Sequence, residues 1–234
     1  MPLKIIKKRL QKLADKETAE TLQKFFKTGP GEYGEGDVFL GIRVPELRKL
    51  AKKYQDIPTE AAIELLFSPI HEKRLLALFI IIHKYNQGNA NTKKEIYELY
   101  LQNSRHVNSW DLVDGSAAHI AGAFLMDKSK APLYRLAASK NLWQRRIAII
   151  ATFHFIKNGL FSETIKISKL LLADKQDLIH KAVGWMLREV GKRDMLTAEA
   201  FLKEHYRVMP RTMLRYAIEK FPESHRQKYL KGEI

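Results

Sequence analysis

The chain has 234 residues, and its 41 Lys and Arg against 26 Asp and Glu give a formal net charge of +15 at pH 7. This balance favours an anionic partner, most simply nucleic acid, although a merely solubilising charge is the alternative. The absence of Cys excludes disulfides and thiolate metal sites. The longest apolar run, 75–82, is too short to span a bilayer, so we expect a soluble, cytoplasmic protein with no membrane partner.

Helical periodicity runs through nearly the whole chain. The N-terminal part is predicted to hold helices at 2–14 and 15–27, with Leu22, Phe25 and Phe26 on the inner side of the second. A glycine-rich loop follows at 28–37, and Pro45 begins the next helix. Because no alternating strand pattern is present, we predict an all-α chain of short paired helices. The further helices are expected at 59–67, 71–85, 92–102, 109–125, 130–138, 142–157, 162–173, 177–192, 197–206, 211–220 and 223–230.

The glycine-rich loop formally contains a G-x-G-x-x-G match at Gly29, Gly31 and Gly34. In a dinucleotide-binding unit this motif follows a strand and opens a helix. Neither a strand nor a βαβ unit is predicted around it here. The loop is therefore expected to connect helical layers.

Four segments of the chain resemble one another at a regular spacing. Arg74, Trp110, Arg146 and Lys181 are separated by 36, 36 and 35 residues. A fixed period of this size, holding two helices, marks an α-solenoid and lies near the range of HEAT-like repeats. We therefore predict a single domain over residues 1–234, a right-handed α-solenoid whose equivalent helices line a concave basic groove.

The predicted helix 109–125 carries the most informative pair of residues. Ser109 can cap its start, and Trp110 and Asp114, four residues apart, share one face. The simpler interpretation is a core Trp beside a solvated Asp. In a chain this basic, the pair also fits a nucleic-acid site.

The equivalent helices further along the chain carry aromatic and basic residues at helical spacing. Lys181, Trp185 and Arg188 share one face of the helix 177–192. Trp143 and Arg146 share a face of the helix 142–157, although Trp143 also fits the core. Together these residues could supply charge for phosphates and rings for sugars or bases.

Other kinds of site find little support in the sequence. Arg145 fits a solvated or phosphate-facing side chain better than a catalytic one. The eight His are scattered, with neither an i,i+4 pair nor an H-E-x-x-H motif, so no zinc site is predicted. Neither a Ser/His/Asp constellation nor a P-loop is visible.

Several of these segments resemble a known family. The runs 110–114 (WDLVD), 144–146 (QRR) and 181–189 (KAVGWMLRE) are similar to those of the DNA alkylation repair glycosylases built of HEAT-like repeats, the AlkD type. The loop 31–37 and the run 39–45, which ends in Gly41-Ile42-Arg43-Val44-Pro45, are also similar. The resemblance spans about residues 25–188, and the combination of motifs is more specific than any one of them.

The resemblance implies excision of N3- or N7-alkylated purines from double-stranded DNA, with no metal and no cofactor. It assigns the catalytic carboxylate to Asp114, the sugar-facing indoles to Trp110 and Trp185, and a phosphate contact to Arg146. Arg188, Lys181, Arg145 and Arg43 are further candidates for DNA contact. A monomer is expected.

The chemistry agrees with this assignment. An N3- or N7-alkylated purine is cationic and leaves as a neutral base, so the leaving group needs no general acid. One carboxylate can stabilise the positive charge that develops on the sugar and can activate water. A non-catalytic binder of damaged or branched DNA is the main alternative, and a scaffold for acidic proteins is a third.

Overall fold

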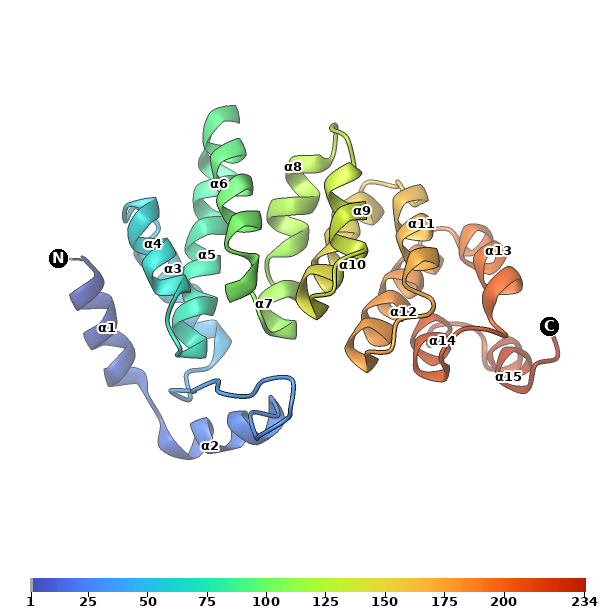
Figure 1. Ribbon diagram of the computed structural model, residues 1–234, viewed down its shortest axis with the longest axis horizontal. Helices are drawn as coiled ribbons and strands as arrows, with labels where there is room; N and C mark the ends of the chain where they lie inside the picture. The colour runs from blue at the N-terminus through green and yellow to red at the C-terminus, as the bar shows by residue number, and fades with distance from the viewer. Residues whose placement is uncertain (1) are drawn as a thin grey trace. The chain divides into compact units, whose positions relative to one another are not determined.

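The computed structural model describes residues 2–234, and every regular element in this range is helical (Figure 1). A lone parallel bridge between Val38 and Ile70 is the one β-type pairing among the described residues. The chain divides into two compact units, Met1–Ser116 and Ala117–Ile234. The all-α prediction is therefore confirmed.

The first unit is built around one central helix. Helices α3 and α4 both pack on α5, and α6 and α7 also contact it. A helix with neighbours on several sides needs an apolar surface all round, which explains the apolar run 75–82. The elements are α1 (Pro2–Leu13), α2 (Lys16–Phe25), α3 (Val44–Lys53), α4 (Thr59–Leu66), α5 (His71–Gln87), α6 (Ala90–Gln102), η1 (Ser104–His106) and α7 (Trp110–Asp114).

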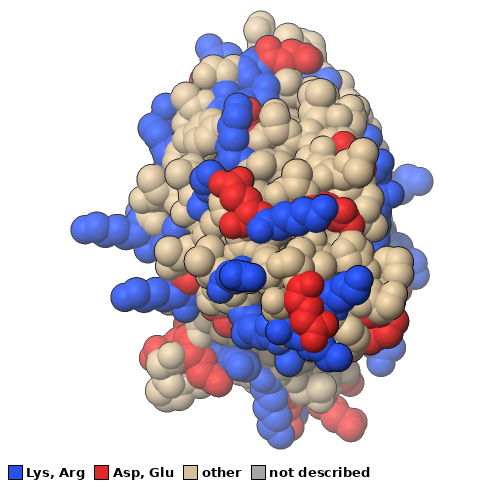
Figure 2. Space-filling view, turned by 90° about the vertical axis from the view of Figure 1, so that its right-hand side faces the viewer, with Lys and Arg blue, Asp and Glu red and all other residues tan. Residues whose placement is uncertain are grey.

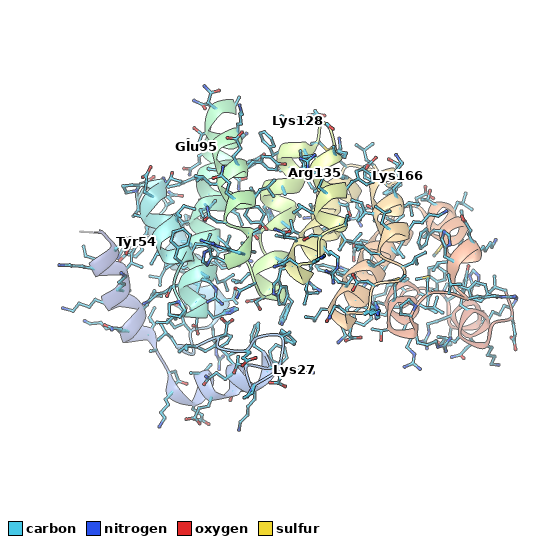
Figure 3. The ribbon with its side chains drawn as sticks, viewed as in Figure 1. Lys27, Tyr54, Glu95, Lys128, Arg135 and Lys166 are labelled. Carbon is cyan, nitrogen blue, oxygen red and sulfur yellow. The ribbon has the colours of Figure 1, made fainter. Side chains whose placement is uncertain are left out.

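A tight contact fixes the loop between α2 and α3 against the start of α2. Lys27, labelled in Figure 3, lies near the start of this loop and is a non-glycine residue with a φ of 53°. Gly41 has a φ of 81°, and a Cβ there would lie 2.1 Å from the Asp15 carbonyl oxygen, so only glycine fits. The carboxylate of Glu72, on α5, accepts hydrogen bonds from the backbone N–H groups of Leu40, Gly41 and Ile42 at 2.8–3.2 Å.

In the glycine-rich part of this loop, backbone N–H groups donate to glutamate carboxylates of the same loop. The Gly29 N–H donates to Glu32 at 2.9 Å, and the Gly31 N–H donates to Glu35 at 3.0 Å. These are the kind of donors that hold a phosphate in nucleotide-binding loops. The expectation that this segment is a connection agrees with the structure, since it joins two helices and follows no strand.

The second unit repeats the pattern of a buried helix flanked by others. Helix α10 packs against η2, α9, α11 and α12, and α12 packs in turn against α13 and α14. Its elements are η2 (Ala118–Gly122), α8 (Ala123–Leu125), α9 (Ala131–Ala137), α10 (Leu142–Lys157), α11 (Ser162–Leu170), α12 (Asp177–Gly191), α13 (Met195–His205), α14 (Arg211–Ala217) and α15 (Glu223–Lys231).

Within each unit, consecutive helices stack in pairs, which is the arrangement of an α-solenoid. Arg74, Arg146 and Lys181 fall in the second turn of α5, α10 and α12, whereas Trp110 begins its helix. The residues that define the sequence period therefore recur near the N-terminal ends of their helices. The hand of the solenoid, the concave basic groove and the single domain stay predictions.

The surface of the C-terminal helices is mixed in charge. Figure 2 shows basic and acidic side chains interspersed over this end of the second unit. The C-terminal helices also carry ion pairs within one helix, including Lys203–Glu199 on α13 and Arg226–Glu223 on α15. The excess of positive charge is therefore not gathered into a uniform patch on this face. Of the helices described, none is long and apolar enough to cross a membrane.

Candidate nucleic-acid interface

Trp110 lies at the edge of an aromatic cluster in the first unit. Its indole stacks on Phe26, with ring centroids 5.1 Å apart and planes 9° apart, and Phe25 meets it edge-on at 6.0 Å. Phe26 packs in turn on Phe39. Trp110 is half-buried, so it lies between the two interpretations that the sequence allowed. The cluster holds the indole ring in one orientation.

Phe25 corrects the expectation for α2. Phe26 is buried, but Phe25 is 63% exposed, although the sequence placed both on the inner side. Adjacent residues on a helix point about 100° apart, and of this pair only Phe26 faces Phe39 and the interior. The result is a solvent-facing ring beside Trp110.

The two carboxylates of α7 have different surroundings. Asp111 is bonded to the buried side chain of His71, with Oδ2 and Nε2 2.8 Å apart. Asp114 is half-buried, and its negative charge adds to burial in raising the pKa of Tyr100 above its usual value. Tyr100 also bonds Ser116 at 3.0 Å. One carboxylate oxygen of Asp111 is therefore already bonded within the protein. Asp114 is the better candidate for the catalytic carboxylate.

His71 bridges two carboxylates. Its Nδ1 lies 2.9 Å from Asp37 Oδ2, and Arg74 donates to the other oxygen of Asp37. Burial lowers the pKa of His71, but the bonds to Asp111 and Asp37 outweigh it and raise the pKa to about 9. Burial raises the pKa of Asp37, and the His71 and Arg74 interactions bring it below the usual value. The cluster therefore holds a charged imidazolium at neutral pH.

The predicted continuous helix 109–125 is wrong. Helix α7 ends at Asp114, and a π-helical turn, η2, runs from Ala118 to Gly122 before α8. Ser109 occupies the N-cap position, but its side chain makes no capping hydrogen bond. Ser116 donates to the Leu112 carbonyl at 2.6 Å, and such bonds often bend helices. The sequence also predicts an apolar stripe at residues 113, 117, 120, 121, 124 and 125. All of these are buried except Phe124, which is half-buried.

Trp185 lies in the second unit beside a second aromatic ring. Its indole is half-buried, with its centroid 5.7 Å from that of Phe153 on α10. The Nζ of Lys157 lies 4.5 Å from the Phe153 ring centroid. Cation, phenyl ring and indole thus follow one another across two helices. Phe153 and Lys157 were missed, although their i,i+4 spacing is visible in the sequence.

Gly184 allows α12 and α14 to approach closely next to Trp185. A Cβ at this position would lie 2.5 Å from the Met213 carbonyl oxygen and 2.5 Å from the Tyr216 Cβ. Real side-chain atoms do not approach so closely. The glycine at 184, directly before Trp185, is therefore a steric requirement of this helix contact.

The alternative for Trp143 is settled in favour of the core. The ring is only 8% exposed, and Ile147 and Ile150 behind it are fully buried. Its backbone N–H is capped by Asn141 at 2.8 Å. Trp143 is therefore not an exposed aromatic of the interface.

The expected DNA contacts of α12 form ion pairs within the protein. Lys181 lies 2.6 Å from Asp177, and Arg188 pairs with Glu219, two residues beyond the end of α14. Lys181 keeps about 40% of its side-chain surface exposed, compared with 18% for Arg188. DNA phosphates would have to compete with these carboxylates, and Lys181 is the more available of the two.

Arg146 and Arg145 are held more firmly. Arg146 is 4% exposed and donates to the carbonyl of Leu178, which ties α10 to the first turn of α12. Arg145 bonds Asp174 at 2.6 Å and the carbonyls of Ser139 and Lys140 at 2.9–3.0 Å. The structure therefore differs from the solvated side chain expected for Arg145. The guanidinium N–H groups of Arg145 donate to these two carbonyls and so hold the loop before α10 in place.

We predict that Arg145→Ala lowers the free energy of unfolding by about 3 kcal/mol, because it leaves buried Asp174 without its partner. The slope of log affinity against log salt for duplex DNA should not change. Lys181→Ala should instead reduce that slope by about one unit and leave stability nearly unchanged. Denaturant unfolding and binding titrations at several salt concentrations measure both effects. An Arg145→Ala protein of unchanged stability with a shallower salt slope would restore the phosphate role.

Arg43 is exposed at the N-cap position of α3. Hydrogen bonds from Thr18 lower the pKa of Asp15, and the nearby charge of Arg43 contributes to the shift. Arg43 therefore stays available as the DNA contact expected from the sequence. It belongs to the first unit, as Trp110 and Asp114 do.

The fold of stacked helix pairs defines the chain as a helical-repeat protein. A family model described as DNA alkylation repair enzyme matches residues 6–221. The chain belongs to this family, which assigns it to the repair of alkylated DNA.

Two solved structures share the fold. One is described as a predicted DNA alkylation repair enzyme from Enterococcus faecalis, with a TM-score of 0.68 and 19% identity over 90% of this chain and 97% of that one. The other is AlkD2 from Streptococcus mutans, with a TM-score of 0.55 and 19% identity over 88% of this chain and 98% of that one. A comparison with curated protein sequences gives no match.

Proposed function

We propose that the protein is a DNA glycosylase that hydrolyses the N-glycosidic bond of N3- or N7-alkylated purines in duplex DNA. The observation that carries this proposal is the single turn of α7, which presents a half-buried indole and, four residues later, a half-buried carboxylate. Family membership in DNA alkylation repair supports it. A cytoplasmic location suits work on DNA.

The proposed reaction needs one carboxylate and one water. Departure of the neutral purine leaves positive charge on the deoxyribose, and ionised Asp114 stabilises that charge. The water adds its oxygen to C1′ and gives its proton to Asp114, so the products are an abasic site and the free base. An indole face adds cation–π attraction of about 0.5–2 kcal/mol.

We assign the roles as follows. Asp114 is the catalytic group, and Trp110 and Trp185 contact the charged sugar. Arg43, Lys181 and Arg188 bind phosphates, whereas Arg146 and Arg145 act mainly by holding the helices that carry the other residues. That residues of the two units act on one nucleotide is a prediction from the sequence repeat and the family resemblance.

Incubation with a duplex that contains a single 7-methylguanine tests the proposal. Free 7-methylguanine, quantified by mass spectrometry, and alkali-labile abasic sites should appear in equal amounts, above the spontaneous background. Salt-dependent duplex binding without base release would instead favour a non-catalytic DNA-binding protein.

A further inference from the structure

The charged cluster of the first unit joins three segments that are distant in sequence. Asp37 comes from the glycine-rich loop, His71 from the start of α5, and Asp111 from the first turn of α7. The His71 side chain is 2% exposed, and both of its ring nitrogens are used in these contacts. Both nitrogens can donate only when the imidazole is protonated.

We propose that His71, held between Asp37 and Asp111, is a positioning residue for base excision, because it fixes the turn that carries Trp110 and Asp114. The inference rests on the proposed function and deepens it. No group of this cluster needs to touch the DNA. The cluster acts on the site through Asp111, which shares the single turn of α7 with Trp110 and Asp114.

Helix α7 depends on such an anchor. It is only five residues long, its N-cap side chain makes no capping bond, and Gly115 follows it directly. A helix this short has little stability of its own. Asp111, which lies between Trp110 and Asp114 in the sequence, ties this short helix to α5 through its bond to the buried His71.

The aromatic cluster couples the indole to the same histidine. Phe39 stacks on the His71 ring, with centroids 4.4 Å and planes 20° apart, and Phe26 lies 5.0 Å from that ring. Phe26 also carries the stacked Trp110. A shift of the imidazole would therefore reach Trp110 through Phe26 as well as through Asp111.

Loss of the His71 proton should release α7. Four charged groups surround or adjoin the imidazole: Asp37 from the loop, Asp111 from α7, and Glu72 and Arg74 from α5. Arg74 would still pair with Asp37, and Glu72 would still bind the loop. Asp111 would lose the positive charge beside it, and its Oδ1 is already buried without a hydrogen-bond partner. Asp111 is thus the group that moves.

The sign of the pH effect follows from the raised pKa. The contribution of the imidazolium to the free energy of unfolding is fully present below pH 6.5. It is lost as the pH rises through about 9. Excision by the wild-type protein should therefore decline through about pH 9 while the helical content, followed by circular dichroism, is retained.

The test compares Asp111→Asn with wild type in single-turnover excision of 7-methylguanine between pH 6 and pH 10. The asparagine keeps the shape but removes one of the charges that hold the His71 proton. We expect excision at neutral pH to fall about ten- to a hundredfold, with duplex affinity unchanged within about twofold. The alkaline decline should move to lower pH, together with the titration of the His71 ring observed by NMR.

A matched control is His205→Gln, which alters a buried histidine of α13 that contacts Phe201 and Glu204. Its excision rate and pH profile should equal those of wild type. The inference is overturned if Asp111→Asn shifts the His71 titration while the excision profile stays in place.

Failure of the proposed function would look different, because wild type itself would then release no purine. The inference would be decided by the fluorescence of Trp110 in a protein with Trp143→Phe and Trp185→Phe. Emission that follows the titration of His71 supports the coupling of α7 to the cluster. Emission independent of pH from 7 to 10 overturns it.

Discussion

Asp114→Asn should reduce the single-turnover rate of 7-methylguanine release by about a hundred- to a thousandfold, the usual cost of removing one preorganised electrostatic contact in a reacting centre. The amide has the size of the carboxylate, but it can neither offset the positive charge on the sugar nor accept the proton of water. Duplex affinity should stay within about threefold, because the carboxylate contributes repulsion rather than attraction toward phosphates. Measurement of free base at saturating protein separates the two quantities.

The control is Asp127→Asn, which removes an exposed carboxylate beyond α8 and should leave the rate unchanged. Release by Asp114→Asn at the wild-type rate would show that another group supplies the charge. Asp111 would be a poor substitute, because its Oδ2 is bonded to His71.

Gly184→Ala should lower the free energy of unfolding by about 2–3 kcal/mol and should displace the Trp185 segment. The added Cβ would meet the Met213 carbonyl and the Tyr216 Cβ, both 2.5 Å away, and neither is the free end of a flexible side chain. The higher helix propensity of alanine compared with glycine offsets at most about 1 kcal/mol of this loss. Because α12 must move relative to α14, the contact between Trp185 and Phe153 of α10 should also change. Denaturant unfolding and base release measure the two effects.

Gly191→Ala is the matched control on the same helix. There a Cβ would come no closer than 3.3 Å to Ala198 Cβ, and the next atom, on Phe221, lies at 3.6 Å. Small adjustments can accommodate this contact, so stability should change by less than about 1 kcal/mol. Equal stability of the two variants would contradict the steric account of Gly184.

Much of the fold could be predicted because apolar spacing reports helices directly. The predicted helix 142–157 has the same bounds as α10, and Asn141 caps it as a residue of this type does at a helix start. Helix 109–125 failed because its apolar stripe continues through η2. The break depends on local bonds such as that from Ser116 to the Leu112 carbonyl, which apolar spacing does not report.

The candidate site was only partly visible in the sequence. Trp143 and Trp185 look alike in spacing, yet one is buried and the other half-buried, because burial depends on which helices pack against them. The partners of Arg145 and Arg188, Asp174 and Glu219, come from later segments of the chain. Such pairs need the packing of the helices, which a repeat period alone does not supply.

The carboxylates of Glu32, Glu35 and Glu72 give the loop between α2 and α3 its own anions, bound to the backbone N–H groups that a phosphate would need. A nucleotide would have to expel these groups and overcome their negative charge. The loop is thus barred to nucleotides by electrostatics rather than by a steric wall. In a chain of net charge +15, the glycine-rich segment 29–35 is therefore a poor site for a phosphate group, whereas Arg43 at the end of the same loop stays available for one.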